Sequence, residues 1–446
     1  MIPETAKDEL IKKRLAGDTW TSLVKWVNSE LGISVHRTTL QRWYDKEVCI
    51  ETANPEDIEL DTVDDRIKLD RKAATYKAEM THYKKLYENG LKETSKEEVI
   101  LNSIEKFTVP FAKQKLYVKG LPKGSTKGST PQTVVAPLSD THIGEHVDYE
   151  EMAGLNSYNF DIFNKRLYGW ASQLLNLVEL RRQAVPINKL TIPMLGDMIS
   201  GDIHDELIKT NLDSCLQQMI RGANLIAQAL MYLAPHFKEV EVSCVVGNHG
   251  RLTRKPPMKN KYMDWDYMLY QWVAALCKEQ SNITFHIPKS YMSIIEVCNR
   301  NILIMHGDNI AGGGSITSVT RLLTSLRSVV QFRKGLEDEI ERLNGTSSKR
   351  LPTTFDSVMM GHFHRCDELD IGTGQALICG CMKGGDEFAL QRLGVITKPQ
   401  QIVTYWHPKY GMIGKETIYL NRYDKTKSNF TDTLSEIWIN NSFSVV

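Results

Sequence analysis

Residues 133–142 read TVVAPLSDTH, and this short stretch decides the class of fold. Its apolar run at 134–138 predicts a buried strand that ends directly in an acid and a histidine. Similar runs at 190–195, 240–246 and 302–305 predict further strands, and helical patterns at 160–182 and 206–233 separate the first three strands. Strands that alternate with helices indicate βαβ crossovers and a layered α/β core. Runs at 356–360, 376–379 and 402–406 predict a second sheet.

Five of these strand runs are followed by side chains that bind metals. The strings are SDTH at 139–142, GD at 196–197, GNH at 247–249, HG at 306–307 and GHFH at 361–364. Because α/β proteins place their ligands at the strand ends along one sheet edge, we expect the five loops to converge on one pocket. Carboxylate with imidazole suits manganese, iron or zinc. In the D-x-H and H-x-H strings, a persisting strand geometry would point both side chains the same way.

In order and spacing, the five strings resemble the five motifs of the calcineurin-like metallophosphoesterase superfamily, over residues 133–423. The resemblance implies an α/β/β/α sandwich with a two-metal site at the sheet edge. The implied cofactors are two divalent ions, manganese first, with iron, zinc or magnesium as the other candidates. The implied ligands are Asp140, His142, Asp197 and His364 for one metal and Asp197, Asn248, His306 and His362 for the other, with Asp197 bridging the two.

The reaction that this resemblance implies is phosphoester hydrolysis. Two cations about 3.5–4 Å apart activate a bridging water, so that hydroxide attacks the phosphorus without a phosphoenzyme. The resemblance makes Asp197 and His249 the catalytic residues, with His249 protonating the departing oxygen. The family usually has an acid after that histidine, but Gly250 stands here. The other ring nitrogen of His249 therefore needs another partner. The nearest candidate is the polar stretch 201–206, which otherwise reads as the start of a helix.

Basic residues near these motifs are candidate substrate contacts. Arg251 and Arg254 follow the third motif, and with Asn248 they are placed to hold a phosphate. A glycine-rich loop at 312–315 could offer backbone N–H groups to an anion. The alternatives are solvated loop charges for the arginines and a hinge for the glycines.

The first fifty residues predict three short helices, at 5–16, 19–30 and 35–46. A tight LGIS turn before a polar, basic third helix resembles a helix-turn-helix unit, whose last helix enters the DNA major groove. The candidate DNA contacts on that helix are Arg37, Thr38, Gln41 and Arg42. The alternative is a small helical bundle used for protein contacts.

The sequence divides into five segments. A helix-turn-helix-like domain (1–50) is followed by a charged helical arm (55–107), which is a spacer or a dimerisation element and thus a route to a homo-oligomer. Residues 108–132 carry five lysines and no acid, which is typical of a flexible linker. The phosphoesterase domain spans 133–425, and a tail covers 426–446.

Composition restricts the class of protein and its surroundings. The 446 residues include 55 basic and 54 acidic side chains, and this balance of +1 excludes a uniformly basic nucleic-acid binder. The chain begins with acids where a signal peptide would be basic, and it has no run of eighteen apolar residues. None of its eight cysteines forms a C-x-x-C pair. We expect a cytoplasmic protein with no membrane contact, in a bacterial or phage-infected cell.

Three functions fit the sequence. The first is a DNA nuclease, because a DNA-binding unit tethered to the catalytic domain raises the local substrate concentration. The SDTHIG string also resembles the repair-nuclease branch of the superfamily, and the whole layout resembles phage or prophage phosphoesterases. The second is a phosphomonoesterase, a protein phosphatase or a small-molecule or cyclic-nucleotide phosphodiesterase. The third is a DNA-binding scaffold with an inactive phosphoesterase domain.

Overall fold

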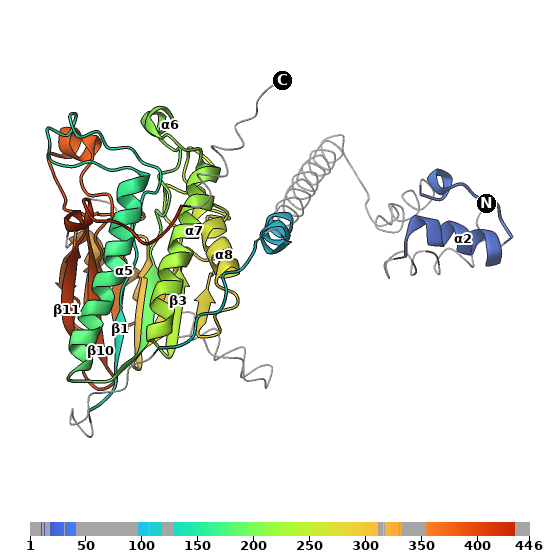
Figure 1. Cartoon of the computed structure of the whole chain (residues 1–446). Coiled ribbons are helices and arrows are strands. Elements are labelled where there is room, and N and C mark those ends of the chain that lie inside the picture. Colours follow the sequence, from blue (N-terminus) through green and yellow to red (C-terminus); the bar gives the residue numbers. More distant parts are fainter. Residues whose placement is uncertain are drawn as a thin grey trace, which may run out of the picture. The chain divides into compact units, whose positions relative to one another are not determined.

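The chain forms two compact units, Met1–Thr94 and Ser95–Val446, which are treated separately. The computed structural model (Figure 1) describes residues 10, 13, 18–30, 32–41, 97–106, 108–117, 129–310, 315, 317–329, 331 and 354–432. None of the helices among these residues combines the length and the apolar character needed to cross a bilayer.

A six-stranded sheet with the order β11-β10-β1-β2-β3-β4 organises the larger unit. Its strands are β1 (Gln132–Val135), β2 (Ile187–Met194), β3 (Glu239–Cys244), β4 (Ile283–His286), β10 (Gln400–His407) and β11 (Gly411–Tyr419). The first four are parallel, and β10 pairs antiparallel with β1 and β11. The predicted first strand ends early, at Val135, because Pro137 lacks an N–H group. The N–H groups of Ala136 and Leu138 still donate hydrogen bonds to carbonyl groups of β2, those of Thr191 and Pro193.

A second sheet has five strands, in the order β5-β6-β7-β9-β8. They are β5 (Met292–Val297), β6 (Arg300–Met305), β7 (Ser357–Met360), β8 (Asp367–Asp370) and β9 (Gln375–Ile378). The sheet is parallel at its centre, and β5 and β8 pair antiparallel at its edges. Cys298 and Asn299, at φ values of 51° and 62°, form the two-residue turn between β5 and β6. The strands predicted at 302–305, 356–360 and 376–379 are confirmed. The run at 402–406, predicted with the second sheet, instead forms β10 of the first sheet, where it pairs with β1.

Helices connect and cover the first sheet. They are α5 (Phe160–Arg182), α6 (Asp205–Thr210), α7 (Cys215–Leu233) and α8 (Trp265–Leu276), with short turns η2 (Ala234–His236), η3 (Ala389–Leu393) and η4 (Asn421–Tyr423). The helix predicted at 160–182 is α5, which Asn159 caps by accepting a hydrogen bond from the N–H of Ile162. The single helix predicted at 206–233 is wrong. It divides into α6 and α7 because Ser214 and Gln217 form a capping box that starts a new helix.

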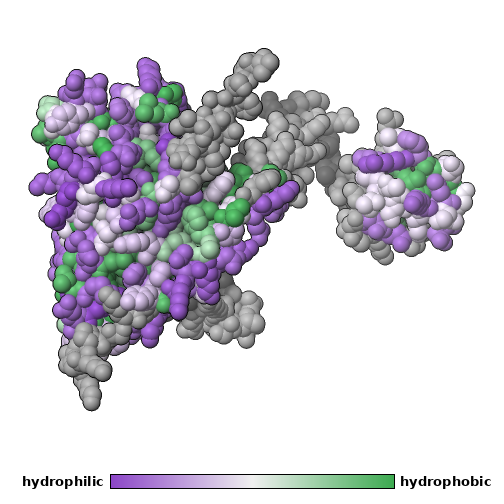
Figure 2. Space-filling model, viewed as in Figure 1, coloured by the Kyte–Doolittle hydropathy of each residue, from purple (hydrophilic) through white to green (hydrophobic). Residues whose placement is uncertain are grey.

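The layers follow the order helix, sheet, sheet, helix. Side chains alternate along β1, so that Val134 faces α5, α7 and α8 while Val135 faces the second sheet. An apolar cluster that includes Val135 and Ile304 fills the space between the sheets. Residues 317–329 are helical and cover the outer face of the second sheet through side chains such as Leu323. Hydrophilic side chains cover much of the surface formed by α5 and α7 (Figure 2). The predicted α/β class with two sheets between helices is confirmed.

The segment before β1 is attached to this core. Residues 97–106 are helical, and the buried Glu97 accepts hydrogen bonds from Tyr262 Oη at 3.0 Å and from Lys289 Nζ at 2.9 Å. Within the predicted linker, the described residues 108–117 have no regular structure. The N–H of Phe111 nevertheless donates to the carbonyl of Leu276 at 2.8 Å.

The smaller unit has an apolar core of its own. Helix α2 (Trp20–Glu30) turns Leu23 and Val27 inward, where they pack with Leu10 and Leu40. Asn28 closes the following turn by accepting a hydrogen bond from the N–H of Val35 at 3.0 Å. Of the predicted third helix, the described residues 37–41 are helical.

Candidate metal centre

The loops after β1, β2, β3, β6 and β7 lie together at one edge of the two sheets. Their histidines and carboxylates form three groups, in each of which the ligand atoms lie within 4.8 Å of one another. The groups are Asp140, His142 and His364; His142, Asp197 and His249; and Asp197, His306 and His362. Asp197 belongs to two groups, which is the position that the sequence resemblance gives to a bridging ligand.

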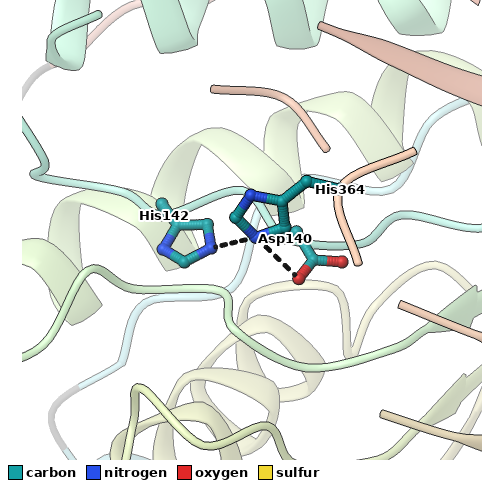
Figure 3. A group of neighbouring side chains, drawn as sticks. All are labelled: Asp140, His142 and His364. Atoms are coloured by element: carbon teal, nitrogen blue, oxygen red, sulfur yellow. Dashed lines mark hydrogen bonds and ion pairs between the residues drawn. The ribbon is translucent and has the colours of Figure 1, made fainter. Parts of the chain in front are cut away.

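The first group is shown in Figure 3. The Nε2 atom of His364 lies 3.0 Å from Nε2 of His142 and 3.4 Å from Oδ1 of Asp140. Asp140 and His142 are fully buried, whereas the His364 side chain is 22 % exposed. The group is therefore enclosed by protein on one side and accessible on the other, as a catalytic metal site must be.

The third group, Asp197, His306 and His362, is centred on His306. Its Nε2 atom lies 3.0 Å from Oδ2 of Asp197 and 3.1 Å from Oδ1 of Asn248. The ring of His362 packs edge-on against that of His306, with centroids 5.1 Å apart. On the far side of the His306 ring, Nδ1 lies 2.7 Å from the backbone carbonyl of Leu195. This contact assigns the proton of a neutral His306 to Nδ1 and directs the lone pair of Nε2 into the site.

The donor set fits a divalent cation. With Nδ1 of His306 donating to Leu195, its neutral Nε2 is an acceptor that faces two further acceptors, the oxygens of Asp197 and Asn248. Three acceptors that converge at about hydrogen-bond distance need a proton or a cation among them. Imidazole, carboxylate and amide oxygen are ligands that manganese, iron and zinc accept.

Burial and neighbouring charges set the protonation of the cluster. Burial alone would lower the pKa of His306, but the Asp197 carboxylate raises it to about 10. Burial and the charge of His306 lower the pKa of His362 to about 4, and burial and Lys383 lower that of His142 to about 4. Although burial opposes its charge, the pKa of Asp197 is held well below its ordinary value by His306. Because neutral imidazoles and ionised carboxylates are the forms that bind metals, His142, His362 and Asp197 are ready to bind an ion, whereas His306 must first lose a proton.

The backbone at the candidate ligands is left-handed. Positive φ values occur at Asp140 (49°), His142 (44°), Asp197 (51°), His362 (69°) and His364 (54°). The expectation that strand geometry persists through the D-x-H and H-x-H strings is therefore wrong, because these residues lie in turns beyond the strands. Such backbone costs on the order of 1–3 kcal/mol for each non-glycine residue, and it concentrates at functional sites.

Glycines allow the motif loops to approach one another. A Cβ atom at Gly247 would collide with Oδ1 and the backbone N of Asp197. A Cβ atom at Gly361 would collide with Oγ of Ser139 and Oδ2 of Asp140. The recurrence of glycine before the candidate ligands thus has a steric cause.

Replacing Gly361 by Ala is expected to lower the free energy of unfolding by about 1–3 kcal/mol and to weaken metal binding, because the added methyl group displaces the Asp140 carboxylate. Urea unfolding and Mn²⁺ titration measure the two effects. Gly414→Ala is the matched control, since its nearest neighbours are 3.5 Å from the added Cβ. Equal stability and metal affinity in the two variants would contradict this role of Gly361.

His249 is held by a backbone carbonyl. Its Nδ1 atom lies 2.8 Å from the carbonyl oxygen of Ser200, so the partner directly precedes the polar stretch 201–206 and is not one of its acids. The acids Asp205 and Glu206 lie in the first turn of α6. The ring of His204 lies beside that of His249, with centroids 5.8 Å apart.

Asp266 supports the site and was missed in the sequence. Its Oδ2 atom accepts hydrogen bonds from the N–H groups of Asp197 at 2.9 Å and Gly247 at 3.0 Å, and Oδ1 accepts from Met198 at 3.0 Å. Burial and the nearby Asp197 raise the pKa of Asp266 to about 6. A Cβ atom at Gly250 would lie 3.0–3.1 Å from Asp266 atoms, so Asp266 fills the space beside Gly250.

The candidate substrate residues are engaged within the protein. The guanidinium of Arg251 donates to three backbone carbonyls, those of Asn248, Thr253 and Arg254. Arg254 is exposed and forms an ion pair with Asp205 at 2.6 Å. Residues 312–314 of the glycine-rich loop lie outside the described residues.

The candidate DNA contacts lie on the smaller unit. Arg37 and Thr38 are exposed, and Gln41 is half-buried. Oγ1 of Thr38 lies 2.9 Å from Nδ1 of His36. Arg42 lies outside the described residues.

Comparison with known proteins gives distant structural similarities. No protein-family model matches the chain, and no curated protein sequence matches it. The Zn²⁺ complex of Vps29 from Entamoeba histolytica is 12 % identical, with 65 % of this chain and 99 % of that chain covered and a TM-score of 0.24. An archaeal phosphodiesterase is 8 % identical, with 64 % and 99 % covered and a TM-score of 0.28. A hypothetical protein from Pyrococcus horikoshii OT3 is 7 % identical, with 69 % and 92 % covered and a TM-score of 0.32. Similarity at this level assigns no activity to the chain.

Proposed function

We propose that this protein is a two-metal phosphoester hydrolase, specifically a phosphodiesterase that cleaves DNA. The observation that carries the proposal is the convergence of candidate ligands from five strand-end loops into three groups that are joined through shared members, His142 and Asp197. Two cations joined by a carboxylate form the kind of centre that hydrolyses phosphoesters. Manganese is the first candidate, with iron, zinc or magnesium as the alternatives.

Each residue of the centre has a part in this proposal. Asp140, His142 and His364 would hold one ion, and Asn248, His306 and His362 would hold the other, with Asp197 as the ligand common to both. When bound, the two ions supply Lewis-acid activation of water and neutralise charge on the phosphoryl oxygens. The protein keeps His142 and His362 neutral and Asp197 anionic, whereas His306 would give up its proton to the ion. The partly exposed His364 leaves one side of the cluster accessible to a phosphodiester.

His249 is the proposed general acid. Because Nδ1 of its ring faces the carbonyl of Ser200, the opposite nitrogen, Nε2, is available to carry the proton that the leaving oxygen takes. The ring of His249 packs against that of His142, with centroids 4.5 Å apart, so the acid lies beside the metal ligands. The protonated Nε2 donates to the leaving group as the P–O bond breaks.

Loading the centre is expected to stabilise the fold. Ligand that binds only the native state at 100 times its Kd adds about 2.7 kcal/mol to the free energy of unfolding. Mn²⁺ should therefore raise the thermal midpoint of the chelator-treated protein, because the converging ligands are brought together only in the native state. Differential scanning calorimetry with and without Mn²⁺ measures this shift. An unchanged midpoint at millimolar Mn²⁺ would count against a metal centre.

The support for DNA as the substrate is the smaller unit. It has its own apolar core, and it exposes Arg37 and Thr38 on a helical segment that follows a closed turn. We infer that this segment contacts DNA and that the tether raises the concentration of DNA at the metal centre.

Replacing Arg37 by Ala is expected to weaken DNA binding. If the side chain contacts a base, the binding free energy should fall by about 1–3 kcal/mol; if it contacts a phosphate, the slope of log affinity against log salt concentration should fall by about 1. Hydrolysis of bis(p-nitrophenyl) phosphate should not change. Fluorescence anisotropy with labelled duplex DNA at several salt concentrations measures the effect. The exposed Arg422 provides the control variant Arg422→Ala. Identical affinity and salt slope in both variants would remove Arg37 from the DNA interface.

A further inference from the structure

A buried charge network lies next to the first ligand group and has no part in the hydrolysis proposed above. The Nζ atom of Lys383 lies 2.6 Å from Oε1 of Glu145, and it also forms an ion pair with Asp386. The side chains of Lys383 and Glu145 are only 3 % and 6 % exposed. Oε2 of Glu145 lies 3.3 Å from Nδ1 of His142.

Burying three charged groups has a large desolvation cost. Replacing a buried ion pair with well-packed apolar residues is often neutral or stabilising, so the network itself is weak evidence for a role in stability. Its position is more informative, because one end touches the rear nitrogen of a candidate metal ligand. This placement suggests a role in the site.

The rear nitrogens of two other site histidines face backbone carbonyls. His306 uses the carbonyl of Leu195 at 2.7 Å, and His249 uses that of Ser200 at 2.8 Å. His142 instead faces a full carboxylate. A carboxylate behind a ligating histidine fixes its tautomer and raises its basicity more than a neutral acceptor does.

We propose that Glu145 and Lys383 are positioning residues for the metal ion held by Asp140, His142 and His364. The Glu145 carboxylate, with Oε2 at 3.3 Å from Nδ1 of His142, favours the tautomer whose proton is on Nδ1, so that the Nε2 lone pair points into the site. Lys383 holds the Glu145 side chain in place through the 2.6 Å contact of Nζ with Oε1. Neither residue contacts the ion or the substrate. This inference rests on the proposed metal centre.

The loop that carries Lys383 is anchored on both sides. The N–H of Met382 donates to the carbonyl of Asp140 at 3.0 Å, which ties the loop to a ligand of the same group. Arg166, fully buried in α5, donates to the carbonyls of Met382 and Lys383, both at 2.8 Å, and pairs with Asp424 at 2.7 Å. These bonds hold the Lys383 ammonium group against Glu145 without help from the ion.

Isothermal titration of the full-length, chelator-treated protein with Mn²⁺ tests the inference. The wild type should bind two ions. In Glu145→Gln, one of the two affinities should fall about 10–100-fold, because the amide has one acceptor for two donors, and the other should stay unchanged. Lys383→Met should weaken the same ion. The double variant should be no weaker than Glu145→Gln alone, since Lys383 acts through Glu145. Glu151→Gln, at an exposed acid in the same loop, is the matched control.

The split between the two ions distinguishes positioning from general destabilisation. Urea unfolding of each chelator-treated variant shows whether it is folded. If Lys383→Met does not fold, the Glu145→Asp variant is titrated in its place. A Glu145→Gln protein that keeps both wild-type affinities, or loses both equally, overturns the positioning role. A wild type that binds no Mn²⁺ overturns the metal centre as well, so the two failures are distinguishable.

Discussion

Asp197→Asn is expected to lower kcat for phosphodiester hydrolysis by about 10³-fold or more. Asp197 is shared by two of the three ligand groups, so its replacement affects both ions. A 10³-fold loss corresponds to about 4 kcal/mol of transition-state stabilisation. Steady-state hydrolysis of bis(p-nitrophenyl) phosphate at saturating Mn²⁺ measures it.

The Asp197→Asn protein should remain folded. Oδ1 of Asp197 accepts hydrogen bonds from the N–H groups of Asn248 and His249, both at 2.7 Å, and an asparagine can preserve these bonds with its own Oδ1. Its amide nitrogen then replaces Oδ2, the oxygen that faces His306, and an amide N–H₂ group has no lone pair for a metal. Wild-type turnover by a folded Asp197→Asn protein would refute the bridging role.

His249→Ala is expected to reduce turnover by about 10²–10⁴-fold on DNA and much less on an activated aryl diester. The reason is that a departing sugar alkoxide needs a proton, whereas p-nitrophenolate is stable as an anion. The comparison of the two substrates separates acid catalysis from metal loss, because metal loss lowers turnover of both substrates together.

His286→Ala is the control for this experiment, since its side chain is 61 % exposed and lies outside the ligand groups. Mn²⁺ titration of the His249 variant shows whether its metal affinity is preserved. Equal losses on the two substrates, with metal bound, would contradict the acid role of His249.

The candidate ligands were predictable because the signal is local. Each lies directly after an apolar run, and parallel strands place their carboxyl ends at a common edge. Asp140 after β1 and His306 after β6 illustrate this, although they belong to different sheets. The left-handed backbone at Asp140 was not predictable, since it depends on contacts such as the one with Gly361.

The supporting residues depend on contacts between distant parts of the chain. Asp266 is 69 residues from Asp197, and Lys383 is 238 residues from Glu145, so no local pattern joins them. The partner of His249 is a backbone carbonyl, which has no sequence signature. The acids at 201–206 were therefore predicted as the partner of His249, whereas its actual partner is the carbonyl of Ser200.

The missed strands have polar or half-buried patterns. The edge strand β8 reads DELD and is largely exposed, so it lacks the apolar run that marks buried strands. Strand β11 alternates irregularly between buried and exposed residues. Such strands are fixed by pairing with a neighbour, β9 or β10, and not by their own composition.

The most direct test of the central claim is a cleavage assay with the full-length, Mn²⁺-loaded protein. Labelled single- and double-stranded DNA, RNA, bis(p-nitrophenyl) phosphate and p-nitrophenyl phosphate are incubated separately, with a chelator-treated sample beside each. The account predicts metal-dependent cleavage of DNA and of the diester. Hydrolysis of the small diester without cleavage of any polynucleotide would contradict the nuclease proposal. No turnover of any substrate by protein that holds its metal would contradict phosphoester hydrolysis itself.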